Sequence, residues 1–336
     1  CRLCFALALW NERDPFLKER LFGVTNPEGN HGEDVKECYF YLDSTPTHSY
    51  MKALYKYPQA EFPYKRLLEE NRRRTRHDPE FELEDTGIFD GNRYFDVFAE
   101  YAKAAPNDIL IRITVVNRGP DAAPLHVLPQ LWYRNTWAWG PSYESGWGKP
   151  VILRTGPDSI EARHASLGTF HFEAESAPAW LFTDNETNAR RLHNAPNRSP
   201  FVKDAFHDYL IGGRFEAVGS DAGTKAAAHY RFLLPPGGTA VIRCRLFGAK
   251  EPGVFDEIFA RRLAEADEFY ACIIPAALSQ DERRIMRQAY AGLLWTRQFY
   301  YYAVGEWLDG DPALPPPEIR KRGRNHEWRH LFNRDV

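Results

Sequence analysis

Hydrophobic and polar residues alternate along most of the first 250 positions. In the run 109–115, isoleucine or valine occupies every second position. A period of two predicts a half-buried β-strand. Runs of similar character predict further strands at 4–10, 35–42, 81–85, 94–101, 125–133, 152–154, 160–164, 170–174, 180–183, 226–233 and 239–247. Gly- and Pro-containing turns between them predict hairpins, so this part of the chain should be rich in β-sheet.

The pattern changes after residue 250, where apolar residues recur three and four positions apart. This spacing predicts a helix over 254–271 and a second one over 279–302. Ser279 and Glu282 form the S-x-x-E signature of a capping box, which marks the start of the second helix. Because strands come first and helices follow, we predict a β-domain over 1–250 and a helical region over 251–336 rather than alternating βαβ units.

Aromatic residues concentrate in an irregular loop and in the carboxy-terminal region. The loop 135–150 holds several tryptophans among glycines and prolines, which suits either sugar binding or packing against a neighbouring domain. In the second helix, an aromatic side can pack in the core or line a pocket, and the tail is either functional or a solvated linker. Our candidate substrate-binding residues are Trp137, Trp139, Trp147, Trp295, Gln298, Asn325 and Trp328.

Composition restricts the class of protein. The 336 residues are 43% hydrophobic and 26% charged with a net charge of −3, which indicates a globular protein and argues against a nucleic-acid binder. No apolar run approaches the ~20 residues that span a bilayer, so we expect no membrane partner. The five cysteines are scattered, which favours free thiols in a reducing cytoplasm over disulfides or a zinc site.

No motif assigns catalysis, a metal or a cofactor. The sequence contains no G-x-S-x-G, H-E-x-x-H, P-loop or G-x-G-x-x-G, and we predict neither cofactor nor metal. His31 with Glu33 and Asp34 could be imagined as ligands, but three polar residues in one loop usually form a hydrogen-bonded turn. Glycoside hydrolysis needs two carboxylates, and none of the 46 acidic residues lies in a context that identifies it.

Several runs nevertheless resemble a known family. They are Asn30–Glu37, Tyr39–Asp43, Thr45–Met51, Leu131–Trp137, Gly292–Trp295, Gln298–Tyr300 and Gly323–Trp328. In these runs the chain is similar to the amino-terminal region of bacterial glucosidase-like proteins related to mannosyl-oligosaccharide glucosidase, glycoside hydrolase family 63. The resemblance implies a β-supersandwich, a helical linker and an α/α toroid that holds the catalytic carboxylates. It also implies an inverting acid–base mechanism without a cofactor.

The chain departs from this family at its end, because Val336 precedes the segments expected to hold the acid and the base. We therefore assign no catalytic residue here, and expect a mainly β fold with linker helices that lead into a largely absent toroid. The expected function is the scaffold and pocket-capping part of an inverting α-glucosidase-like enzyme acting on oligosaccharides or glucosides. Its expected partners are a carbohydrate substrate and the missing toroid. The alternative is a non-catalytic carbohydrate-binding or interaction module.

Overall fold

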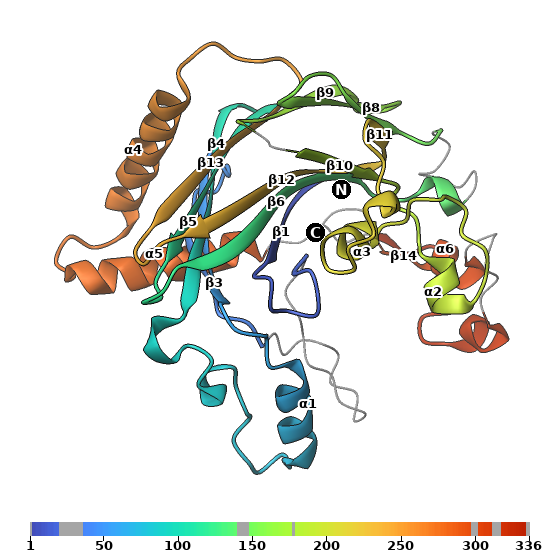
Figure 1. Cartoon of the computed structure of the whole chain (residues 1–336), viewed down its shortest axis with the longest axis horizontal. Helices are drawn as coiled ribbons and strands as arrows, with labels where there is room; N and C mark the ends of the chain where they lie inside the picture. Colours follow the sequence, from blue (N-terminus) through green and yellow to red (C-terminus); the bar gives the residue numbers. More distant parts are fainter. Residues whose placement is uncertain are drawn as a thin grey trace.

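The computed structural model describes residues 2–19, 36–139, 148–176, 179–296, 302–310 and 317–333. Two antiparallel sheets stack on each other, with two long helices outside the larger sheet (Figure 1). The fold is mainly β, as predicted from the alternating pattern. The described residues contain no α/α toroid.

The larger sheet has nine strands among the described residues, in the order β11-β7-β8-β9-β13-β5-β4-β3-β2. Its strands are β2 (Tyr39–Ser44), β3 (Tyr50–Pro58), β4 (Tyr94–Ala105), β5 (Asp108–Asn117), β7 (Val151–Arg154), β8 (Ser159–His164), β9 (Gly168–Ala174), β11 (Ala222–Gly223) and β13 (Thr239–Phe247). The smaller sheet, in the order β1-β6-β12-β10, contains β1 (Leu3–Trp10), β6 (Ala123–Tyr133), β12 (Lys225–Leu234) and β10 (Ala179–Thr183).

The main core lies between the two sheets and follows from the alternation in the sequence. Ile111, Ile113 and Val115 of β5 pack with Val127 and Leu131 of β6, and all five side chains are at most 1% exposed. Residues of the opposite parity point to the outer faces. The predicted half-buried strand at 109–116 is thus confirmed.

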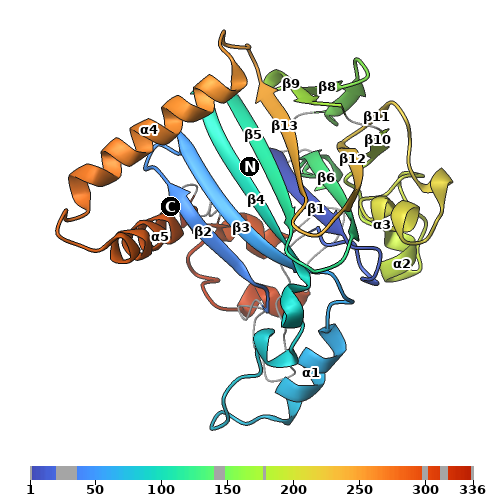
Figure 2. The same cartoon turned by 60° about the vertical axis from the view of Figure 1, so that its left-hand side comes forward.

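Helix α4 (Phe255–Ile273) crosses the outer face of the larger sheet, and α5 (Gln280–Trp295) lies beside its β2 edge (Figure 2). Ile258 and Phe259 of α4 pack on Tyr50 and Leu110 of the sheet. Leu110 is therefore fully buried, although its side chain points away from the main core. Helix α4 and the sandwich share this second cluster, and the domain division at 250/251 stays a prediction.

Ser279 caps α5 as predicted. Its hydroxyl accepts a hydrogen bond from the Glu282 backbone N–H at 3.3 Å, and its own N–H donates to Glu282 Oε2 at 2.8 Å. The helix ends at Trp295 and residues 297–301 of the predicted helix lie outside the described residues, but Tyr302 lies in a strand, so the predicted end at 302 was wrong.

Two predictions about the amino-terminal half were wrong. The run 81–85 is not a strand: Phe81 and Leu83 are buried against Leu67 of α1 (Tyr64–Arg73), so the alternation there reflects packing on a helix. Conversely, β3 is absent from the predicted strands, although it runs over Tyr50–Pro58. Pro58 is the last residue of this strand and lies beyond the pairing with β2, which ends at Tyr55, so its missing N–H costs no ladder hydrogen bond to β2.

Shorter elements complete the fold. The helices are α2 (Ala189–His193), α3 (Ala205–Leu210) and α6 (Val304–Asp309), and the 3₁₀ helices are η1 (Glu84–Thr86), η2 (Asp90–Asn92), η3 (Trp137–Trp139), η4 (Phe215–Ala217) and η5 (Glu318–Arg322). A small pair of strands, β14 (Tyr302–Ala303) and β15 (Phe332–Asn333), joins the two ends of the carboxy-terminal segment.

Candidate functional site

Four charged residues form a row across the outer face of the larger sheet. Asp43 of β2 pairs with Lys52 of β3, Lys52 with Glu100 of β4, and Glu100 with Arg112 of β5. Paired residues on neighbouring strands point to the same face, so the four side chains lie side by side and their charges alternate in sign. We call this set the charge row. With neighbouring strands about 4.8 Å apart, Asp43 and Glu100 are separated by roughly 10 Å at their Cα atoms.

Glu100 holds the centre of the charge row as a buried carboxylate, 5% exposed. Its oxygens accept hydrogen bonds from Arg112 Nε at 3.0 Å, Arg112 Nη2 at 3.1 Å and the Tyr50 hydroxyl at 2.8 Å. Burial alone would raise the pKa of Glu100. The hydrogen bonds from Arg112 and Tyr50 and the nearby charge of Lys52 outweigh burial and lower the pKa instead. The Arg112 guanidinium also lies 4.4 Å from the centre of the Phe259 ring, which fixes it beneath α4.

Asp43 lies at the β2 end of the charge row and binds a side chain of α5. Arg287 of α5 donates from Nη2 to Asp43 Oδ2 and from Nη1 to Asp267 Oδ1 of α4, each at 2.5 Å. Burial raises the pKa of Asp43, although the hydrogen bond and charge of Arg287 oppose that shift. One guanidinium thus joins the sheet edge and both helices.

Trp295, a candidate substrate-binding residue, lies next to this junction. Its ring stacks on Tyr41 with centroids 4.9 Å apart and planes 11° apart, and it meets Tyr101 edge-on at 6.0 Å. The indole N–H donates to the backbone oxygen of Asp43 at 3.0 Å. These contacts correspond to the core-packing alternative, and a role in sugar binding stays a prediction.

A cavity of about 450 Å³ lies between the charge row and the two helices. Its lining includes carboxylate, guanidinium and ammonium groups, which can donate and accept hydrogen bonds. Neither Glu100 nor Asp43 is free to act as an acid or base, because Glu100 is ion-paired with Arg112 and Asp43 with Arg287. The arrangement can bind a polar molecule, and it does not supply the two free carboxylates of a glycosidase.

The base of the tryptophan loop forms a separate polar cluster. Trp137 of η3 packs partly on the main core and donates from Nε1 to Glu186 Oε1 at 2.5 Å. Asn135 donates to the other Glu186 oxygen at 3.0 Å, and Glu186 is 7% exposed. The indole N–H of Trp137 therefore fixes the loop base. Trp147, Gln298 and the side chain of Trp139 lie outside the described residues.

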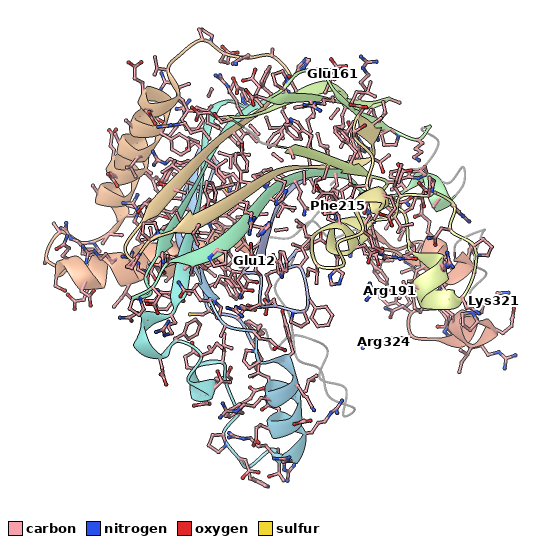
Figure 3. All side chains as sticks on the ribbon, in the orientation of Figure 1. Glu12, Glu161, Arg191, Phe215, Lys321 and Arg324 are labelled. Atoms are coloured by element: carbon pink, nitrogen blue, oxygen red, sulfur yellow. The ribbon has the colours of Figure 1, made fainter. Side chains whose placement is uncertain are left out.

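The carboxy-terminal candidates belong to the β14–β15 unit. Asn325 has a positive φ of 64° and donates to the Tyr302 hydroxyl at 3.4 Å. Trp328 is 54% exposed and stacks on His330 at 5.9 Å. Lys321 and Arg324 of the same unit are labelled at the lower right of Figure 3. Trp137, Trp295 and Trp328 have different partners among the described residues, so the structure does not gather them into one site.

Sequence reasoning missed a cluster on the outer face of the smaller sheet. His126 of β6 contacts Glu12 through Nε2 at 2.9 Å and His229 of β12 through Nδ1 at 2.8 Å, and Arg231 Nε donates to the same Glu12 oxygen at 2.9 Å. Glu12, labelled in Figure 3, follows the end of β1 at Trp10. Burial lowers the pKa of both histidines, that of His229 to about 4. No signal in the sequence links Glu12 to His126, because the sheet pairing alone brings them together.

The His31, Glu33 and Asp34 loop lies outside the described residues. Within the described ranges, no three His, Cys, Asp or Glu side chains are placed to hold a metal ion, and Cys4, Cys38, Cys244 and Cys272 are free thiols. A search of those residues for a helix both long and apolar enough to cross a membrane finds none.

Comparison with known proteins gives a relative of undescribed activity. No protein-family model matches the chain. The uncharacterized protein YMR196W of Saccharomyces cerevisiae (strain ATCC 204508 / S288c) is 41% identical over 385 residues, covering 99% of this chain and 35% of the relative. The chain thus spans about a third of the length of that relative.

Solved structures give weaker likenesses. A protein described as a kojibiose phosphorylase from human microbiome has a TM-score of 0.27 and 8% identity, over 59% of this chain and 21% of that chain. A polysaccharide lyase has a TM-score of 0.30 and 10% identity, over 78% and 27%. Likenesses at this level carry no argument about the function of this chain.

Proposed function

We propose that the chain is the amino-terminal scaffold of a larger glycoside-hydrolase-like enzyme, whose catalytic carboxylates reside in a helical toroid that docks on α5. The observation that supports this proposal is the two-sided character of α5. One side is fastened to the sheet by Trp295 and Arg287. The other side exposes Ile285 at 61%, Tyr290 at 37% and Leu293 at 70%.

The exposed side of α5 is continuous along the helix. Ile285 and Leu293 are eight positions apart, a little over two turns, so they lie about 80° apart around the helix axis on one broad side. Leaving large apolar side chains in water forgoes roughly 1.5–3 kcal/mol each, which burial under another domain would recover. A helical domain following in the same protein is the occupant we propose, since the yeast relative is much longer than the matched part. Exposed apolar patches of this kind mark interaction surfaces.

The proposed reaction is inverting hydrolysis of α-glucosides or oligosaccharides without a cofactor, as the sequence resemblance implies. The loop that begins at Trp137 would cap the sugar pocket, together with Trp139 and Trp147. Glu186 supports this role by holding the loop base through Trp137 and Asn135. A reducing, cytoplasmic location is part of the proposal and is supported by the free cysteines.

The proposed docking on α5 is tested by making the substitution Leu293→Glu both in this chain and in the full parent protein. In this chain, Leu293→Glu should change the free energy of unfolding by no more than about 0.5 kcal/mol, because the side chain is exposed. In the full parent protein, the same change should place a charge in an interface and destabilise it by several kcal/mol. Gln280→Glu, an exposed site of the same helix, is the control in both. Equal effects of Leu293→Glu in the two proteins would refute the docking.

The activity is tested with α-glucosides, and the anomer released first is followed by NMR. The parent protein should release the β-anomer, as inversion requires, and this chain alone should show no turnover. Retention, turnover by the isolated chain, or inactivity of the parent towards every α-glucoside and oligosaccharide offered would each overturn the proposal.

A second candidate, a carbohydrate-binding module, is favoured by the exposed ring of Trp328. Flat aromatic rings bind the apolar faces of sugars. This reading requires that oligosaccharides change the tryptophan fluorescence of this chain alone, and that Trp328→Ala abolish the change. An unaltered spectrum would dismiss it.

A further inference from the structure

A surface loop at the end of α1 has no part in the proposed scaffold. It projects with α1 away from the sandwich, at the bottom of Figures 1 and 2. Asn71 closes its base: Asn71 Nδ2 donates to the Phe81 backbone oxygen at 3.0 Å, and the Phe81 N–H donates to Asn71 Oδ1 at 3.0 Å. Asn71 Nδ2 also donates to the Leu67 backbone oxygen at 3.1 Å, which ties the base to α1. Residues 72–80 therefore form a loop anchored at one place.

Thr75 lies in this loop directly after three arginines, Arg72, Arg73 and Arg74. Nowhere else in the sequence are two adjacent arginines followed, after one intervening residue, by a serine or threonine. Arg72, Arg73 and Thr75 are exposed. Protein kinases select substrates by the charges around the hydroxyl group, and one class reads arginines two and three positions before it. Thr75 has the pattern that this class requires.

A tight turn presents the Thr75 hydroxyl at the surface. Thr75 Oγ1 donates to Asp78 Oδ2 at 2.9 Å, the Thr75 N–H donates to the same oxygen at 2.7 Å, and the Asp78 N–H donates to the Thr75 backbone oxygen at 3.0 Å. The two hydrogen bonds from Thr75 lower the pKa of Asp78, so its carboxylate is ionised at neutral pH. Both residues are exposed, so the turn can open without uncovering the core.

Opening the turn leaves the base of the loop in place. Arg73 Nη1 lies 3.0 Å from Glu70 Oε1 in an exposed ion pair, and pairs of this kind contribute little to stability. Unwinding the last turn of α1 therefore disrupts only weak contacts of Arg73. Residues 72–78 can extend into a kinase cleft while Asn71 keeps Phe81 against α1.

We propose that Thr75 is a phosphorylation site for an arginine-directed serine/threonine kinase, and that phosphorylation opens the turn at 75–78. The γ-phosphorus of ATP forms a bond to Thr75 Oγ1, its bond to the β,γ-bridging oxygen breaks, the hydroxyl proton passes to the catalytic base of the kinase, and ADP leaves. The hydroxyl donor to Asp78 is lost, and a phosphate of charge near −2 repels the Asp78 carboxylate. The site goes beyond the proposed glycosidase scaffold and stands without it.

Labelling of this folded chain by the catalytic subunit of cAMP-dependent protein kinase with radioactive ATP tests the site. Incorporation should approach one phosphate per chain, with mass spectrometry placing it on Thr75, and Thr75→Val should lower it at least tenfold. Thr155→Val is the matched control, because Thr155 is exposed and its hydroxyl donates to Ser159 Oγ at 3.1 Å; it should leave incorporation within twofold. No incorporation, or equal incorporation in the wild type and Thr75→Val, would overturn the proposal.

A double variant tests recognition of the arginines. Arg72→Gln with Arg73→Gln should slow phosphorylation tenfold or more. Arg190→Gln with Arg191→Gln, which changes the exposed arginine pair of α2, should leave the rate within twofold. A thermal melt of each variant verifies folding. Equal slowing in both double variants would show non-specific attraction and refute the site.

Hydrogen exchange tests the opening of the turn. In the phosphorylated chain, the Thr75 and Asp78 amides, which are bonded within the turn, should exchange at least threefold faster. The Phe81 amide, bonded to Asn71 at the base, should keep its rate. Unchanged or slower exchange at Thr75 and Asp78 would refute the opening.

Discussion

Acidification should destabilise the chain through the histidine pair on the smaller sheet. His229 has a pKa lowered to about 4 by burial and by the charges of His126 and Arg231, compared with 6.5 in an exposed histidine. Below pH 6.5 His229 is therefore protonated in the unfolded chain but stays neutral in the folded chain. The contribution of His229 to stability is fully present above pH 6.5 and is lost as the pH falls towards 4.

The size of the effect follows from the two pKa values of His229. At pH 5 the unfolded state gains about 2 kcal/mol over the folded state from this residue, and at pH 4 about 3 kcal/mol. Burial lowers the pKa of His126 as well, so its contribution has the same sign.

Urea unfolding followed by tryptophan fluorescence between pH 7.5 and pH 5 measures this loss. His229→Gln should retain an amide donor towards His126 Nδ1 and cannot titrate, so it should lose about 2 kcal/mol less than the wild type over that range. His193→Gln, which changes an exposed histidine, should follow the wild type. Parallel losses in the wild type and His229→Gln would refute the reasoning, because the folded state would then accept the proton as readily as the unfolded state.

Three further substitutions address packing and ion pairing, each measured as the free energy of unfolding in urea. Asp108→Asn should cost about 3–5 kcal/mol, because Asp108 is fully buried and is the bidentate partner of Arg245 at 2.8 and 2.6 Å; a loss under 1 kcal/mol would contradict it. Trp295→Ala should cost roughly 2–4 kcal/mol and speed hydrogen exchange in α5; unchanged exchange would show that other contacts hold the helix. Gly223→Ala should cost about 1–3 kcal/mol, since a Cβ would meet the Thr183 carbonyl oxygen at 2.3 Å; a neutral result would mean the backbone yields.

The sequence predicted those features that depend on local periodicity. The strand at 109–116 and the start of α5 follow directly from an alternation of two and from the Ser279–Glu282 signature. The prediction of a strand at 81–85 failed because apolar and polar residues also alternate where irregular chain packs on a helix such as α1.

The candidate site depends on pairing between distant segments and was beyond such reasoning. Asp43 and Arg287 are 244 residues apart, and only strand register reveals that Lys52 separates Asp43 from Glu100. The amino-acid composition drew attention to the tryptophans. It could not predict that Trp295 stacks on Tyr41 and donates a hydrogen bond to a backbone oxygen.

The position of α5 beside β2 has a consequence for the edge of the larger sheet. An uncovered final strand offers unpaired N–H and C=O groups on which another chain can extend the sheet. Helix α5 packs along β2 at this edge, and the bulge between Tyr41 and Asp43 interrupts the regular ladder. Detachment of α5 would therefore uncover the β2 edge for pairing with a strand of another chain, so we expect this helix to limit aggregation through that edge.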